Sequence, residues 1–147
     1  MKSKLKVLFL CTGNSCRSQM AEGWTRHLHG EAVEAWSAGI ETHGLNPNAV
    51  AVMKEAGVDI SGYRSKNVTE LLDVPFDFVI TVCGDADERC PFFPGNARII
   101  HRGFDDPPKL AMGKTTEEEK LDCYRRIRDE IRAFIENLPG FLENFPE

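Results

Sequence analysis

The sequence lacks a long hydrophobic run. The longest apolar stretch near the N-terminus, Val7 to Cys11, is too short for a signal-peptide core or a membrane span. Basic residues are not in excess either: 18 Lys and Arg stand against 23 Asp and Glu, a formal net charge of −5. We therefore expect a cytoplasmic protein without general attraction to membranes or nucleic acid, in which local dipoles and a few cations capture any bound anion.

Repeats, low-complexity segments and linkers are also missing. The 147 residues, 41% hydrophobic and 28% charged, have a composition typical of soluble proteins. We expect one domain over residues 1–147, and nothing in the sequence calls for more than a monomer. An odd number of cysteines, in a chain expected to have no secretory leader, disfavours a permanent disulfide framework. Reactive or redox-cycling thiols then have to be considered among Cys11, Cys16, Cys83, Cys90 and Cys123.

Apolar periodicity predicts strands that alternate with helices. Asn46 before Pro47 is a good helix start, and Thr116 and Glu119 have the spacing of a capping box. We expect the last helix to end at Pro139-Gly140. This order predicts an α/β sandwich with a mostly parallel sheet. The expected strands are 5–10, 34–38, 76–82 and 97–101, and the expected helices follow residue 16, residue 46 and residue 116.

A polar loop follows the first expected strand and reads Cys11-Thr12-Gly13-Asn14-Ser15-Cys16-Arg17-Ser18. Successive N–H groups of such a loop can point at one centre, and the following helix adds the positive end of its dipole. Arg17 can donate two parallel hydrogen bonds to a tetrahedral anion. Cys11 would lie at the floor, where its pKa is expected to fall from about 8.5 into a range of roughly 3.5 to 7.5. The loop therefore predicts an oxyanion site with Cys11 as nucleophile.

The loop also allows plainer interpretations. Cys11 can be a buried strand-end thiol and Arg17 a surface residue, but Gly13 and Asn14 tolerate unusual backbone angles, which favours the oxyanion site. Neither glycine pattern of a nucleotide-binding loop is present. The spacing of the cysteine pairs is too wide for structural zinc, so we expect no metal and no cofactor. Ser18 can donate to a thiolate at position 11, whereas Cys16 is interpreted as a packed thiol.

Four segments carry a resemblance that spans nearly the whole chain, namely residues 7–23, 37–47, 81–91 and 103–107. They resemble the low-molecular-weight tyrosine phosphatase superfamily and, within it, the thioredoxin-coupled arsenate reductases. The resemblance implies a three-layer α/β sandwich in which helices flank a four-stranded parallel sheet. Phosphatases share the nucleophile loop, so Cys83 together with Cys90 specifies the reductase branch.

The resemblance implies that the protein reduces arsenate to arsenite. Cys11 would attack arsenate, or bind phosphate or sulfate as mimics, while the loop amides and Arg17 hold the anion. Asp106 would protonate the departing oxygen, and its position before Pro107 suits a catalytic loop. Asp105 is the closest competitor for this role.

The resemblance also implies a relay of thiols. Cys83 would attack Cys11, and Cys90 would then attack Cys83 and carry the disulfide to the surface for thioredoxin, with glutaredoxin and glutathione as the other electron donor. A helix over residues 83–90 would separate its end residues by about 10.5 Å along the helix axis. A disulfide allows roughly 7 Å between α-carbons, so this segment must loop or unwind.

Two other functions remain open. A low-molecular-weight phosphatase would hydrolyse phosphomonoesters through a phosphocysteine at Cys11 and would need no relay thiols. An oxyanion-binding module without catalysis would keep its function with serine at position 11. The discriminating feature is the pair Cys83 and Cys90.

The sequence departs from the family at a potassium site. Some members bind potassium near the loop through residues like Asn14, Glu22 and Ser37 and a Thr-Ser-Asp stretch, where this sequence has Arg64-Ser65-Lys66. We therefore predict no potassium site and a pair between the Lys66 ammonium and Glu22. Cys123 is interpreted as a structural thiol, and the four histidines receive no role.

Overall fold

The computed structural model describes residues 4–83 and 95–145. Its centre is a sheet of four parallel strands in the order β2-β1-β3-β4. The strands are β1 (Leu5–Cys11), β2 (Val33–Gly39), β3 (Phe78–Cys83) and β4 (Arg98–Phe104). The predicted α/β class, the four-stranded parallel sheet and all four expected strands are confirmed.

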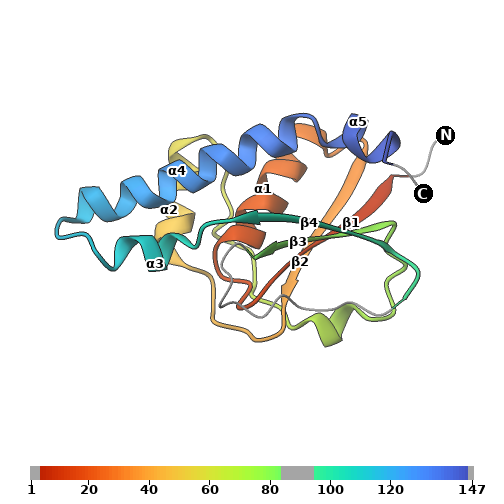
Figure 1. The fold of residues 1–147 in the computed structure, drawn as a ribbon, viewed down its shortest axis with the longest axis horizontal. Helices are drawn as coiled ribbons and strands as arrows, with labels where there is room; N and C mark the ends of the chain where they lie inside the picture. Colours follow the sequence, from red (N-terminus) through yellow and green to blue (C-terminus); the bar gives the residue numbers. More distant parts are fainter. Residues whose placement is uncertain (1–3, 84–94, 146–147) are drawn as a thin grey trace.

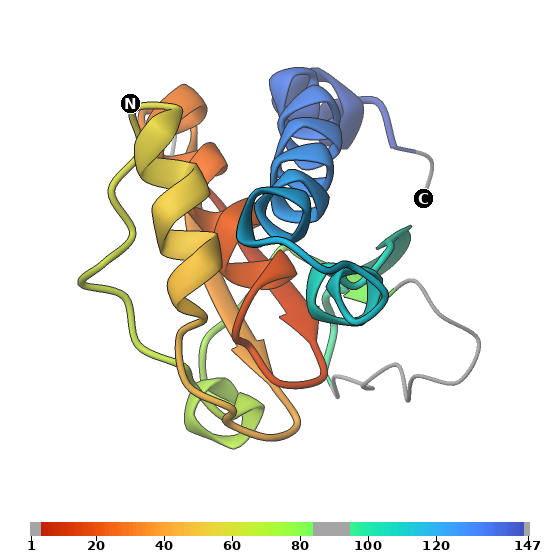
Figure 2. The same ribbon diagram turned by 90° about the vertical axis from the view of Figure 1, so that its left-hand side faces the viewer.

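Helices and short turns connect and cover the strands (Figures 1 and 2). The long α4 crosses the molecule and contacts α1, α2 and α3. Opposite the long helices, η1 packs on the other face of the sheet. The elements are α1 (Arg17–His29), α2 (Pro47–Glu55), η1 (Val68–Leu71), α3 (Pro107–Ala111), α4 (Glu117–Glu136) and α5 (Leu138–Glu143).

The central strands are buried on both faces. Successive side chains of a strand point to opposite faces, so Val7 and Phe9 of β1 pack on the helices, whereas Leu8 and Leu10 join the cluster beneath η1. In α4, isoleucines at every fourth position form the fully buried stripe that meets the sheet. This stripe consists of Ile127, Ile131 and Ile135.

The predicted starts of α2 and α4 are confirmed, whereas the predicted end of the last helix is only partly correct. Asn46 caps α2, and Thr116 with Glu119 forms the predicted capping box of α4. The long helix does end before Pro139, but α5 begins at Leu138 and holds Pro139 in its first turn, where a missing N–H is tolerated. Among the described residues, no helix has the length and apolar character needed to cross a membrane.

The capping box of α4 gives a test of the fold. Thr116 Oγ1 accepts from the Glu119 N–H at 3.1 Å, so Thr116→Ala leaves that donor without its partner. We expect the free energy of unfolding to fall by about 1 kcal/mol. The melting temperature should drop by roughly 2–4 °C. Thr116→Ser keeps the hydroxyl and serves as the control, and an unchanged melting temperature for the alanine variant would contradict the prediction.

Candidate active site

The carboxyl ends of neighbouring parallel strands meet at one edge of the sheet. β1 lies between β2 and β3, so Cys11, Gly39 and Cys83 end side by side. Open α/β sheets bind ligands at this edge. A cavity of about 460 Å³ opens there, lined by Cys11, Thr12, Gly13, Ser15, Cys16, Arg17, Ile40, Glu41, His43, Asp106 and Pro108.

Every backbone carbonyl of residues 12–16 accepts a hydrogen bond from another residue. The C=O and N–H of one planar peptide point in opposite directions, so holding the carbonyls outward turns the amides toward the cavity. The predicted oxyanion cradle thus has its physical cause in the surrounding chain. The N–H groups of Glu41, His43, Asn46 and Met20 donate to the carbonyls of Thr12, Gly13, Ser15 and Cys16, respectively. The side-chain amide of Gln19 donates to the carbonyl of Asn14, and all five bonds measure 2.9–3.1 Å.

Asn14 has the unusual backbone that the sequence suggested, with a φ of 48°. Its side chain is fully buried and stabilises this left-handed conformation through three hydrogen bonds. Its Oδ1 accepts from the Lys66 N–H at 2.7 Å and from Gln19 Nε2 at 3.0 Å. Its Nδ2 donates to Ser18 Oγ at 2.9 Å, and the contact between Ser18 and the thiolate stays a prediction.

Two glycines allow other segments to approach the loop closely. A β-carbon at Gly13 would clash with the imidazole ring of His43. A β-carbon at Gly39 would lie 2.6 Å from the Thr12 carbonyl oxygen and 2.8 Å from the Asn14 nitrogen. Gly39 is therefore required by this close approach, because the atoms that a β-carbon would meet there belong to the backbone.

Arg17 is buried at the first position of α1 and is fixed by contacts from the other end of the chain. One terminal nitrogen donates to the Phe104 carbonyl at 3.0 Å, and the other lies 3.7 Å from Asp106 Oδ1. Asp105 instead pairs with Arg126 at 2.9 Å and lines no part of the cavity. Of the two candidate acids, the structure brings Asp106 to the site.

The described thiols lie in different surroundings. Cys11 and Cys16 line the cavity, but burial, reinforced by Asp106, raises the pKa of Cys16 and keeps it protonated. Cys83 is buried at the end of β3, with its Sγ 3.9 Å from Thr12 Oγ1. Cys123 is buried on α4, as predicted. Cys90, with the prediction that residues 83–90 loop or unwind, lies outside the described residues.

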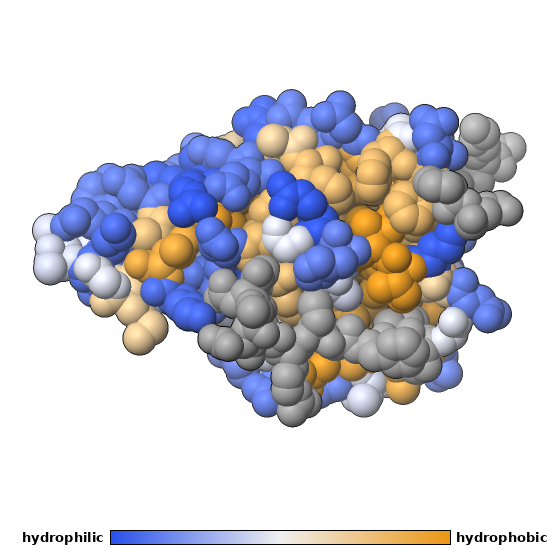
Figure 3. Space-filling model, viewed as in Figure 1, coloured by the Kyte–Doolittle hydropathy of each residue, from blue (hydrophilic) through white to orange (hydrophobic). Residues whose placement is uncertain are grey.

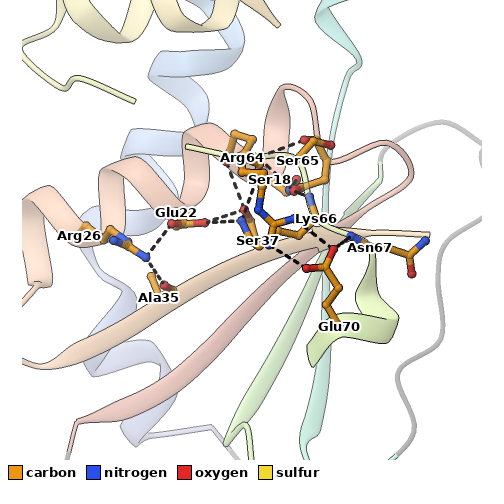
Figure 4. Close-up of polar contacts among 12 residues, drawn as sticks. Ser18, Glu22, Arg26, Ala35, Ser37, Arg64, Ser65, Lys66, Asn67 and Glu70 are labelled. Atoms are coloured by element: carbon orange, nitrogen blue, oxygen red, sulfur yellow. Dashed lines mark hydrogen bonds and ion pairs between the residues drawn. The ribbon is translucent and has the colours of Figure 1, made fainter. Parts of the chain in front are cut away.

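A buried carboxylate lies behind the loop (Figure 4). Glu22 is 4% exposed; its carboxylate accepts from Ser37 Oγ at 2.6 Å and pairs with Arg26 at 2.9 Å. The Lys66 Nζ lies 3.8 Å from Glu22 and donates to the Arg64 carbonyl at 2.9 Å. The predicted pair of Lys66 and Glu22 is confirmed. Burial lowers the pKa of Lys66, and Glu22 opposes this effect.

Sequence reasoning missed the residues that follow β2. Ile40, Glu41 and His43 line the cavity, and the Glu41 carboxylate lies 2.6 Å from the His43 imidazole. The available signal was Gly39, which ends the strand beside β1 and so delivers the next residues to the same edge. Gln19 was missed as well, although it supports Asn14.

The comparisons with known proteins agree with this fold and site. Residues 6–143 match the low molecular weight phosphotyrosine protein phosphatase family, and the chain belongs to that family. An arsenate reductase from Bacillus subtilis (strain 168) is 51% identical over 131 residues, which cover 89% of this chain and 91% of that protein.

Two solved structures extend the comparison. One is described as an arsenate reductase in the phosphate binding state; it has a TM-score of 0.76 and 32% identity, and the match covers 94% of this chain and 98% of that chain. The other is a thioredoxin-dependent arsenate reductase from Corynebacterium glutamicum, with a TM-score of 0.68, 29% identity and coverage of 97% of this chain and 64% of that one. The predicted resemblance is confirmed.

The pair of Lys66 and Glu22 gives a second prediction. Lys66→Met removes a cation from beside a buried carboxylate, and we expect a loss of about 1 kcal/mol in stability. Potassium should then raise the melting temperature of the variant above its value in sodium at equal ionic strength. Arg64→Met is the matched control, because the Arg64 side chain pairs with Glu70 instead. Specific stabilisation of the unmodified protein by potassium would contradict the prediction.

Proposed function

We propose that this protein reduces arsenate to arsenite through a relay of Cys11, Cys83 and Cys90 that thioredoxin regenerates. One observation carries the proposal: a second buried thiol, Cys83, ends the strand beside the one that bears the cavity thiol Cys11. The identity with an arsenate reductase over most of the chain supports it.

The cavity suits a compact tetrahedral oxyanion. The amides of the loop and the start of α1 supply a positive field, and Arg17 adds a charge held in place by Phe104 and Asp106. Arsenate and phosphate share shape and charge, so one cradle accepts both. A related arsenate reductase structure in the phosphate binding state supports this reading.

In the first step, the Cys11 thiolate attacks arsenic. A sulfur–arsenic bond forms and an arsenic–oxygen bond breaks, while Asp106 donates a proton so that the oxygen leaves as water. The amide hydrogens and the Arg17 guanidinium stabilise the charge on the remaining oxygens.

In the second step, Cys83 attacks the sulfur of Cys11. A disulfide forms, and the electron pair of the sulfur–arsenic bond stays on arsenic, which leaves as arsenite in the trivalent state. Cys11 stands one residue beyond Leu10 and Cys83 stands two residues beyond its partner Thr81, so the two thiols end adjacent strands. A disulfide between them needs their α-carbons within roughly 7 Å. The Thr12 hydroxyl, 3.9 Å from Cys83 Sγ, can donate to that sulfur when it is ionised.

In the third step, Cys90 attacks Cys83, which forms the disulfide of Cys83 and Cys90 and releases Cys11. The dithiol of thioredoxin then reduces this disulfide and becomes oxidised itself. The similarity to a thioredoxin-dependent arsenate reductase from Corynebacterium glutamicum supports thioredoxin over glutathione as the donor.

A phosphatase is the second candidate, which the family match favours. The same cradle would hold a phosphomonoester, Cys11 would form a phosphocysteine, and water would complete the cycle without Cys83 or Cys90. The third possibility, anion binding without catalysis, fits less well with a thiol that lines the cavity itself.

The relay predicts arsenate-dependent oxidation of a thioredoxin system. With thioredoxin, thioredoxin reductase and NADPH, arsenate should start NADPH consumption, and Cys11→Ser, Cys83→Ser or Cys90→Ser should abolish turnover. Phosphatase activity that remains in the Cys83 and Cys90 variants is compatible with either function, so only the arsenate assay decides.

A second experiment identifies the disulfide of Cys11 and Cys83 as the intermediate. After one arsenate turnover in Cys90→Ser, mass mapping should find Cys11 linked to Cys83, because no later thiol can resolve that disulfide. Cys123→Ser serves as the matched control and should turn over normally. A link between Cys11 and Cys16, or reduced thiols beside released arsenite, would refute the relay.

The position of Asp106 generates a further prediction. Asp106→Asn cannot protonate the departing oxygen, so kcat should fall about 10²-fold or more. The KM for arsenate should not rise, because Arg17 keeps its charge and its contact with Phe104. Asp105→Asn is the control and should leave both constants nearly unchanged, since Asp105 pairs with Arg126 outside the cavity. Equal losses in both variants would argue against Asp106 as the acid.

A further inference from the structure

β4 is an edge strand with an unusual outer surface. Among the described residues, no strand pairs with its outer edge. Apolar side chains gather over β4 and α5 on this side of the molecule (Figure 3). A cavity of about 340 Å³ lies between β4 and the helices, and a second of about 530 Å³ lies beside α5; Phe141 lines both. We call Arg98, Ile100, Arg102, Phe134 and Phe141 the β4 edge surface.

The apolar part of this surface is accessible and well supported. Phe141 is 41% exposed, although it is a large hydrophobic residue. Phe141 stands in a row of rings in which neighbours make edge-to-face contacts at 5.7–6.2 Å between centroids. Rings held in this way lose little conformational freedom when a partner covers them.

The polar part of the surface is cationic. The Arg98 guanidinium stacks on Phe78 at 4.5 Å, and that of Arg102 stacks on Phe104 at 4.3 Å. Both donate to backbone carbonyls, and neither forms an ion pair with a carboxylate in the described part of the chain. In a chain with a net charge of −5, these two arginines give this face a local positive charge.

The position of the surface connects it with the relay. Cys83 at the end of β3 pairs with Phe104 of β4, the ring on which Arg102 stacks. On its other side, β3 borders β1 and the anion cavity. A protein that comes over β4 therefore approaches the strand end bearing Cys83 without covering the cavity.

We propose that the β4 edge surface is the docking site for the thioredoxin that reduces the enzyme, with carboxylates of thioredoxin facing Arg98 and Arg102. This inference rests on the proposed function. A second copy of this chain is a poor occupant, because antiparallel pairing of two β4 strands about Ile100 would set Arg98 opposite Arg102 of the other copy. Like charges directly opposite one another destabilise a sheet.

The test distinguishes an effect on thioredoxin docking from an effect on the reduction of arsenate itself. Arg102→Glu and Phe141→Ser should raise the KM for thioredoxin about tenfold, which corresponds to the loss of one strong interface contact. Arsenate turnover driven by dithiothreitol should stay within about twofold of the unmodified enzyme, because a small dithiol needs no docking surface. Arg102→Met keeps the cover over Phe104 and should have a smaller effect of the same sign.

A matched control is available in the same helix layer. Arg132 also stacks on an aromatic ring, Trp24 at 4.9 Å, but lies outside the β4 edge surface, so Arg132→Glu should leave the KM for thioredoxin unchanged. The salt dependence of this KM should weaken in Arg102→Met, because part of the electrostatic attraction is gone. Equal KM values for the Arg102, Phe141 and Arg132 variants would overturn the docking site.

The outcome also distinguishes failure of the docking site from failure of the proposed function. An unmodified enzyme that reduces no arsenate with dithiothreitol would refute the proposed function and the docking site with it. An enzyme that turns over with dithiothreitol but not with thioredoxin would refute the proposed partner while the chemistry stands.

Discussion

The site depends on the outward orientation of five carbonyl groups. A loop of residues 12–16 has no intrinsic reason to point its amides at one centre, and an unsupported loop would sample many conformations. The supports come from three different parts of the chain: the segment after β2, the start of α2 and the first turns of α1. The cradle is therefore formed before any anion enters, and binding does not have to order it.

Charge is arranged in layers around this cradle. Arg17 faces the cavity and is balanced by Asp106, whereas Glu22 lies behind the loop and is balanced by Arg26 and Lys66. A buried carboxylate without cations would be costly. The same Lys66 also donates its backbone N–H to Asn14, which holds the left-handed turn of the loop. A single residue thus links the buried carboxylate to the backbone that points at the substrate.

The features that the sequence predicted are those encoded by residues that lie close together in the chain. The capping box of Thr116 and Glu119 and the loop from Cys11 to Ser18 are contiguous, so the sequence could reveal them. Glu41 and His43 reach the cavity only because β2 pairs with β1, and η1 and α5 are too short to form without tertiary packing. The choice of Asp106 over Asp105 likewise needed the structure, because two adjacent carboxylates differ only in which arginine each meets.

The relay has a geometric consequence for the whole sheet. In the proposed cycle, arsenite leaves when the disulfide of Cys11 and Cys83 forms, and thioredoxin acts only afterwards on the disulfide of Cys83 and Cys90, so the two sites are needed at different steps. The strand order β2-β1-β3-β4 places Cys83 between the strand that carries the anion cavity and the strand that carries the docking surface. In the proposed relay, electrons would enter on the β4 side and reach arsenic on the β1 side. The relay thiols would then connect a substrate site and a reductant site that lie on opposite sides of β3.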